Sequence, residues 1–369
     1  HNNGSSKHQP PVPVPSKSWP LIQAPSLPGI EYAQQDQESK NEKKEDILSV
    51  ESLMNYCAPE VTNIQTRRDV QGSDGEIEGA IWISPVMKIR NARQSKKKEL
   101  DVHGFELIAP HRIPDTIDLK NDDHIIDQYY PICEQLLQEK TGATIVKAFD
   151  HNVRKSGNTA AAASNGNNGG VVLQQPIGVV HNDYTHVSAP RRLEQLAQPP
   201  KANDSLKSKL VQSSLLDPKM VQEVLEGKRR FCFVNVWRNI QKNQPVQQFP
   251  LACVDATTQS LEEMLTFSII YADRIGENYF CTYAPEQQQS KHDWYYFSNM
   301  VREEALLIKQ WDSHGTLAKA KEQEPKENAP FLSTFSLHSA FADPTSPKDA
   351  PPRESIEVRC VLIWDLEEK

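Results

Sequence analysis

Residues 355–364 read SIEVRCVLIW, and this run decides the fold class. It is rich in Val, Ile and Trp, which is typical of a β-strand. Similar runs precede it at residues 80–89, 104–108, 143–150, 177–180, 230–240 and 335–341. Because long connections separate these runs, and because they do not alternate regularly with helices, they favour an antiparallel jelly-roll barrel over a doubly wound sheet.

Helical periodicity accompanies the strands in three places. Apolar residues recur at helical spacing within residues 124–139, 218–225 and 298–309, which predicts a helix at each. Strands dominate the second half of the chain, with helices outside them. The sequence therefore predicts a mainly β protein with flanking helices (α+β) and a jelly-roll core.

Composition separates one end and one loop from the rest of the chain, which has 369 residues. Residues 1–45 are rich in Pro, Ser, Gln and Lys, which predicts a disordered or draped N-terminal arm. Residues 46–369 are expected to form a single jelly-roll domain. Within it, NTAAAASNGNNGG at residues 158–170 predicts a low-complexity surface loop at about 155–170. The Lys- and Glu-rich residues 314–328 are expected to be a solvated helix or loop.

The net charge restricts the expected binding partners, and the pattern of cysteines restricts the expected cellular compartment. The net charge is −8, and the one dense basic run, at residues 96–98, lacks interleaved aromatic residues. It is expected to be a solvated strand end or turn, and no nucleic-acid partner is expected. No long apolar stretch and no signal peptide is visible, so no membrane association is expected. The cysteines form no CxxC pair, which predicts reduced core thiols of a cytoplasmic protein. They are Cys57, Cys133, Cys232, Cys253, Cys281 and Cys360.

The chemistry is concentrated in VVHNDYT at residues 179–185. On an extended segment, His181 and Asp183 point to the same side, so an imidazole and a carboxylate reach one ion. A third ligand is needed, and His338 within SLHSAF is the candidate. The plainer interpretations are a strand-end histidine for His181 and a hydrogen-bonded core histidine for His338.

The residues after His338 favour a metal site. Beyond a Pro-rich turn, Arg353 and Ser355 fall on one face of the next strand, where guanidinium and hydroxyl can bind one carboxylate. Fe(II) held by two imidazoles and one carboxylate keeps positions open for a chelating 2-oxo acid and for O₂. A zinc hydrolase can use the same three ligands, but it does not need the Arg-x-Ser pair.

The order HxD, then His, then RxS resembles the Fe(II)/2-oxoglutarate-dependent dioxygenase superfamily, whose core is a double-stranded β-helix (jelly roll). Several phrases resemble more closely its fungal hydroxylase/desaturase family, which groups with gibberellin desaturase and tailoring enzymes of secondary metabolism. The resemblance covers roughly residues 78–366. The phrases are FDHNVR (149–154), HNDYT (181–185), NVWR (235–238), PLACVD (250–255), WYYF (294–297), KQWDS (309–313), HSAF (338–341) and PPRESIEVR (351–359).

The resemblance implies Fe(II) ligation by His181, Asp183 and His338. It also implies that Arg353, assisted by Ser355, binds 2-oxoglutarate. The spacing from His338 to Arg353 is long for the superfamily, which leaves Arg359, on the same face, as the alternative.

Further residues are candidates for the pocket lining: Asn235, Trp237, Arg238, Tyr184 and Phe341. Core packing is the alternative for Trp237, and an ion pair with Asp255 or Asp312 is the alternative for Arg238. Arg154 is similarly ambiguous. His186 departs from the ligand spacing and is expected to support the ligands or lie at the surface.

The activity expected is hydroxylation, desaturation or oxidative ring closure of a small organic molecule in fungal secondary metabolism, with Fe(II), 2-oxoglutarate and O₂. Two alternatives are a catalytically inactive jelly-roll binding protein and a zinc hydrolase that uses the same triad. A protein- or nucleic-acid-demethylating oxygenase is disfavoured, because the acidic chain lacks a basic groove. The substrate and the oligomeric state stay open.

Overall fold

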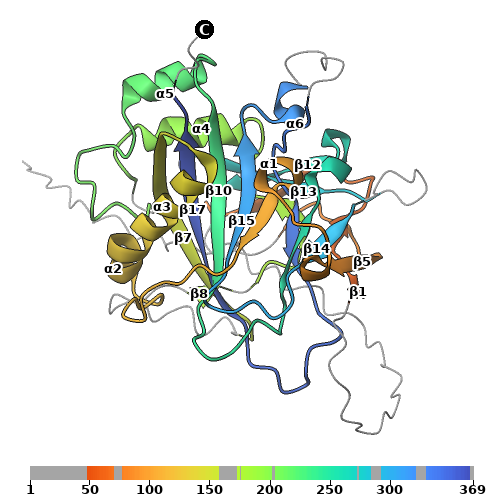
Figure 1. The fold of residues 1–369 in the computed structure, drawn as a ribbon. Coiled ribbons are helices and arrows are strands. Elements are labelled where there is room, and N and C mark those ends of the chain that lie inside the picture. Colours follow the sequence, from red (N-terminus) through yellow and green to blue (C-terminus); the bar gives the residue numbers. More distant parts are fainter. Residues whose placement is uncertain are drawn as a thin grey trace, which may run out of the picture.

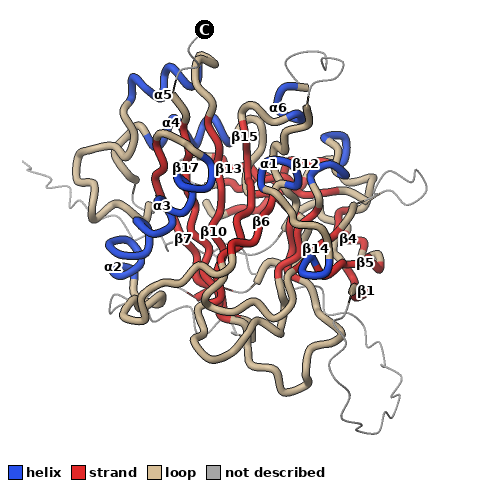
Figure 2. The backbone as a smooth tube through the Cα atoms, in the orientation of Figure 1, coloured by secondary structure: helices blue, strands red, loops and turns tan. Residues whose placement is uncertain are grey.

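Strands fill the centre of the molecule and short helices lie at its periphery (Figure 2). The computed structural model describes residues 48–69, 77–157, 173–174, 176–201, 204–271, 274–283, 292–320 and 330–365. The mainly β class with flanking helices is thereby confirmed. The expected arm at residues 1–45 and most of the expected loop at 155–170 lie outside the described residues, as does the segment of 314–328 beyond residue 320.

The larger sheet carries nine strands in the order β1-β5-β14-β11-β16-β9-β13-β12-β3. Its pairings are antiparallel except β14 with β5 and β12 with β3. The strands are β1 (Ser49–Leu53), β5 (Val86–Asn91), β14 (Trp294–Tyr296), β11 (Leu251–Val254), β16 (His338–Ala340), β9 (His181–Asn182), β13 (Ile275–Cys281), β12 (Met264–Ile270) and β3 (Ile64–Arg67). Two short strands, β2 (Tyr56–Cys57) and β4 (Trp82–Ile83), pair separately.

The second sheet carries six strands in the order β6-β15-β10-β17-β7-β8. They are β6 (Phe105–Ile108), β15 (Ala305–Asp312), β10 (Phe231–Asn239), β17 (Glu354–Ile363), β7 (Ile145–Lys155) and β8 (Leu173–Gln174). β17 pairs with β10 on one side and β7 on the other, and all its residues are buried. Its Ile356, Val358 and Cys360 alternate with the polar Ser355, Glu357 and Arg359 and join the main core. The polar residues therefore share the opposite face.

Six α-helices occur among the described residues: α1 (Leu100–His103), α2 (Asp122–His124), α3 (Tyr130–Thr141), α4 (Ser188–Leu196), α5 (Pro218–Leu225) and α6 (Thr316–Lys319). A π-helical turn at Ile125–Tyr129 joins α2 to α3. α3 covers the outer face of β7 and β17 (Figure 1). It turns Cys133 and Leu137 into the core and ends at Gly142, whose φ of 68° favours glycine.

The helix expected at 218–225 is confirmed as α5, and the one at 124–139 is confirmed within α2 and α3. The helix expected at residues 298–309 is wrong. β15 begins there at Ala305, between β6 and β10, and buries both of its faces. A short run that is buried all round has no strand or helix period to read, so its partners decide its conformation.

The strand expected at residues 177–180 is also wrong in its bounds. Only an isolated bridge from Val179 to Asn55 is formed there, and the paired strand β9 starts at His181. The core interpretation of the cysteines is confirmed, because all six are buried free thiols. In the part of the chain that is described, no helix has both the length and the apolar character needed to cross a bilayer.

Candidate metal centre and active site

His181, Asp183 and His338 lie together inside the molecule. β9 and β16 are neighbours in the larger sheet, with His181 directly opposite His338. One potential ligand atom from each of the three side chains lies within 4.8 Å of the other two. All three are buried, and the two imidazole centroids are 4.4 Å apart. The structure thus brings together the residues that were named as ligands from a separation of more than 150 positions.

Backbone carbonyls orient both imidazoles. Nδ1 of His181 is 2.7 Å from the carbonyl oxygen of Val179, and Nδ1 of His338 is 3.1 Å from that of Ser336. A carbonyl only accepts, so each Nδ1 carries the proton and each Nε2 presents a lone pair. Burial, together with the neighbouring His338, lowers the pKa of His181 to about 3. His181 is therefore neutral, as a metal ligand must be.

Asp183 is held as an oriented carboxylate. Its Oδ2 accepts hydrogen bonds from Nδ2 of Asn235 at 3.0 Å and Nε of Arg359 at 3.2 Å. Its Oδ1 lies 3.8 Å from Nε2 of His181. Burial alone would raise the pKa of Asp183, but the charge of Arg359, together with the hydrogen bond from Asn235, outweighs burial and holds it well below its usual range. One oxygen is thus fixed by the protein while the other faces the imidazoles.

A β-bulge in strand β15 also holds the segment Asn182–Asp183 in place. Where β15 pairs with β10, Gln310 is the extra residue between Lys309 and Trp311. Its Oε1 accepts from the Asp183 backbone N–H at 3.1 Å, and its backbone carbonyl accepts from Nδ2 of Asn182 at 2.8 Å. Sequence reasoning missed Gln310, although it lies in the phrase KQWDS. The only feature of the sequence that could have indicated its role is that a polar residue interrupts an apolar run.

Arg359 is engaged by carboxylates. Besides Asp183, its guanidinium donates to Oδ2 of Asp150 at 3.0 Å and Oε1 of Glu357 at 3.3 Å. Burial opposes the charge, but these three carboxylates raise the pKa of Arg359 well above its usual value. An arginine that is already paired in this way orients the candidate ligand Asp183 and is a poor partner for a further anion.

Arg353 and Ser355, by contrast, remain the candidates for an anion site. Both are buried, and the Arg353 guanidinium lies over the ring of Trp237, 5.6 Å from its centroid. Nη1 donates to the carbonyl of Phe249, whereas Nε has no hydrogen-bond partner. Burial, and then the charge of Arg154, lower the pKa of Arg353 to about 9. An unpartnered buried donor is costly, and a carboxylate would satisfy it.

The other residues predicted to line a pocket differ in what they contact. Asn235 contacts Asp183, and Tyr184 stacks on Phe233 with centroids 4.6 Å apart. Trp237 belongs to a buried apolar cluster, which confirms its core interpretation. Its ring also contacts the Arg353 guanidinium, and its pocket role stays a prediction. Phe341 packs edge-on against Tyr296 in the core, and its pocket role stays a prediction.

Arg238 does not line the site. It lies on the opposite face of β10, where its guanidinium donates to the hydroxyl of Tyr129 at 2.9 Å and to the carbonyl of His111. The alternation of side chains along a strand places it opposite to Asn235 and Trp237. His186 is exposed, with Nδ1 2.8 Å from the hydroxyl of Tyr279. This fits its expected place at the surface.

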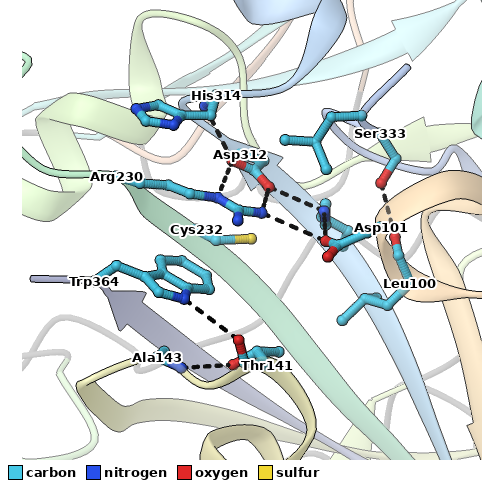
Figure 3. Close-up of polar contacts among 12 residues, drawn as sticks. Leu100, Asp101, Thr141, Ala143, Arg230, Cys232, Asp312, His314, Ser333 and Trp364 are labelled. Carbon is cyan, nitrogen blue, oxygen red and sulfur yellow. Dashed lines mark hydrogen bonds and ion pairs between the residues drawn. The ribbon is translucent and has the colours of Figure 1, made fainter. Parts of the chain in front are cut away.

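The ion pair suggested for Arg238 is not formed either. Asp312 is buried beside Arg230, whose Nε donates to it at 3.0 Å (Figure 3). Nζ of Lys309 also donates to Asp312, at 2.9 Å. Asp255 pairs with Lys98 at 3.1 Å. Lys98 also sits 3.8 Å from the ring centroid of Tyr295, so the last residue of the basic run 96–98 is packed rather than solvated.

Comparison with known proteins places these features in a wider group. The family model described as oxidoreductase/YMDC permease-like domain matches residues 54–213 and 206–363. An uncharacterized protein in the dcmA 3′ region of Methylophilus leisingeri is 34% identical, covering 52% of this chain and 91% of that protein. The Fe(II)/2-oxoglutarate-dependent dioxygenase nvfI of Aspergillus novofumigatus is 28% identical, covering 76% of this chain and 84% of that protein.

Two further comparisons agree with these. The hydroxylase/desaturase CTB9 of Cercospora beticola is 28% identical, covering 76% of this chain and 77% of that protein. A solved structure of the iron and alpha-ketoglutarate-dependent endoperoxidase NvfI shares the fold, with a TM-score of 0.64, 22% identity, and coverage of 86% of this chain and 98% of that chain. The resemblance drawn from the sequence is therefore confirmed by the relatives and by the fold.

Proposed function

The chain belongs to the oxidoreductase/YMDC permease-like domain family, and we propose that it is an Fe(II)/2-oxoglutarate-dependent oxygenase. Its reaction is hydroxylation, desaturation or oxidative ring closure of a small organic molecule in fungal secondary metabolism. The observation that carries this is the buried group of His181, Asp183 and His338 beside the unpartnered guanidinium nitrogen of Arg353. The dioxygenase and hydroxylase/desaturase names of the relatives support it.

The donor set fits the expected groups. Two imidazole nitrogens and a carboxylate oxygen are the ligands of the facial triad of non-haem Fe(II) oxygenases. His181, Asp183 and His338 would hold the iron, and Arg353 with Ser355 would hold the distal carboxylate of 2-oxoglutarate. When bound, iron and 2-oxoglutarate supply with O₂ the oxidising power of the reaction.

The chain's own residues prepare and protect this chemistry. The carbonyls of Val179 and Ser336 keep both imidazoles in the ligating tautomer. Asn235 and Arg359 keep Asp183 ionised and oriented. Because the three ligand side chains are buried, the surrounding side chains limit access of bulk water, which strengthens the electrostatic interactions.

The domain arrangement belongs to the same proposal. Two largely antiparallel sheets fit a double-stranded β-helix core. The two histidines of the triad lie on adjacent strands of one sheet, with Asp183 directly after β9, and Arg353 leads into a central strand of the other. The family match from residue 54 to residue 363 supports a single domain over residues 46–369.

The test measures succinate formation by metal-free protein supplied with Fe(II), 2-oxoglutarate, ascorbate and O₂. We expect slow release without a substrate, because uncoupled decarboxylation needs only the iron site. His338→Ala should abolish it, and Arg353→Ala should raise the 2-oxoglutarate concentration required. The control His186→Ala changes an exposed imidazole nearby and should behave as the wild type. No iron uptake and no succinate in the wild type would favour the inactive binding protein or the zinc hydrolase.

A further inference from the structure

On one face of strands β7 and β17, polar side chains of the two strands lie opposite one another. We call this set the polar ladder and each opposing pair a rung. Arg359, which donates to Asp183, belongs to it. The rungs are Arg359 opposite Asp150, Glu357 opposite Asn152 and Ser355 opposite Arg154. Arg353 follows: its carbonyl accepts from the Ser156 backbone N–H, and its own backbone N–H donates to Oγ of Ser156. Residues diagonal to one another across two such strands lie within reach of long side chains. Arg154 and Arg353 are diagonal neighbours of this kind, and both are buried.

The charges on this ladder are unevenly shared. The carboxylates Asp150, Asp183 and Glu357 all accept hydrogen bonds from Arg359. Of the other two arginines, Arg154 donates to Oε1 of Gln174 at 3.1 Å, and Arg353 donates to the carbonyl of Phe249. The register therefore places two buried guanidinium groups next to each other at the end of the ladder away from Arg359.

The distance between this positive end and the triad suits a five-carbon diacid. The Arg353 guanidinium lies over the ring of Trp237. Trp237 is paired with Glu357, which comes two residues before Arg359 in β17. Two residues of a strand span ~7 Å. The charge of Arg353 thus lies about one rung from Arg359, which contacts Asp183. This is close enough for one ligand to reach both Arg353 and the triad.

We propose that Arg154 is a second co-substrate-binding residue, which acts with Arg353 to hold the distal carboxylate of a dicarboxylic 2-oxo acid. This rests on the proposed function and assigns a role to a residue that the sequence left ambiguous. A carboxylate between the two guanidiniums relieves their mutual repulsion and satisfies the Nε of Arg353. Ser355, opposite Arg154, provides a hydroxyl at the same rung.

The experiment measures binding rather than turnover. Mn(II)-loaded protein is titrated calorimetrically with 2-oxoglutarate and with 2-oxopentanoate, in which a methyl group replaces the distal carboxylate. We expect Arg154→Gln to weaken 2-oxoglutarate binding about 10- to 100-fold, the range for one lost charge-assisted hydrogen bond. Binding of 2-oxopentanoate should change less than about 2-fold, because it has no group for Arg154 to contact.

Two further measurements make the result decisive. Arg154→Lys keeps the charge without the fork, so it should lose less 2-oxoglutarate affinity than Arg154→Gln and should fold if Gln is not tolerated. Equal losses for both ligands, or no loss for either, would overturn the role of Arg154 while leaving the proposed function intact. If the Mn(II)-loaded wild type bound neither ligand, the proposed function itself would fail, and the role of Arg154 with it.

Discussion

Asp183 shows how a single residue is shared between the protein and the expected metal. Its Oδ2 is occupied by Asn235 and Arg359, and its backbone N–H by Gln310. Only Oδ1 faces the imidazoles. Residues that hydrogen-bond a metal ligand fix its direction and its basicity, so their loss affects metal binding without removing a ligand.

Asn235 is the simplest residue on which to test this. Asn235→Ala removes the neutral donor to Asp183, and we expect metal affinity to fall by about 10- to 100-fold, as is usual for such supporting residues. Competition between the protein and a chromophoric chelator for Co(II) measures the affinity. Asn239→Ala, in the same strand but bonded to the carbonyls of Gln244 and Met300, is the control. Unchanged affinity in Asn235→Ala would contradict the role.

At the scale of elements, the site depends on where strands meet and where one of them is irregular. β9 contributes only His181–Asn182, and its register opposite β16 brings the two imidazoles together. The bulge in β15 turns Gln310 towards Asp183, while Lys309 beside it is buried against Asp312. Bulges are known to redirect side chains next to active sites.

The bulge should matter through the side chain of Gln310. Gln310→Ala leaves the Asp183 N–H without its acceptor, so the loop becomes less well held and we expect Co(II) affinity to fall about 10-fold. The Co(II) absorption spectrum should change as well, because the carboxylate ligand is then less constrained. Gln222→Ala, on the exposed side of α5, is the matched control. A spectrum and affinity equal to those of the wild type would refute a positioning role.

At the scale of the whole molecule, helix α3 and the loop before α2 are joined to the sheet by buried polar contacts. Arg238 of β10 donates to Tyr129 beside α3 and to the carbonyl of His111 in that loop, and it also contacts Nδ1 of His111. Burial, and then the charge of Arg238, lower the pKa of His111 to about 4. The folded state therefore favours the neutral imidazole.

This shift predicts an acid-dependent loss of stability. The unfolded pKa of a histidine is about 6.5. Because the folded pKa is lower, the contribution of His111 is fully present above pH ~6.5 and is lost as the pH falls towards ~4. Urea unfolding at pH 7 and at pH 4.5 measures it. His111→Gln retains an acceptor for Arg238 and should lose less stability over this interval than the wild type. Equal losses in both proteins would show that His111 is not responsible.

The sequence by itself determined the mainly β class and two of the three helices, and it predicted the triad that the structure brings together. His181, Asp183 and His338 were recognisable because the chemistry of a metal site restricts ligand types and because residues two apart on an extended chain share a side. It also singled out the Arg353–Ser355 pair, since alternation in a strand is a local property.

Only the tertiary structure decided which of the polar residues serve the site. Arg238 and Asn235 belong to one strand, but they occupy opposite faces of the sheet, so Arg238 contacts Tyr129 beside α3 and Asn235 contacts Asp183. The engagement of Arg359 by three carboxylates, the bulge at Gln310 and the strand at residues 305–312 likewise arise from pairing between distant segments. Such pairings depend on contacts across the chain, and local composition does not encode them.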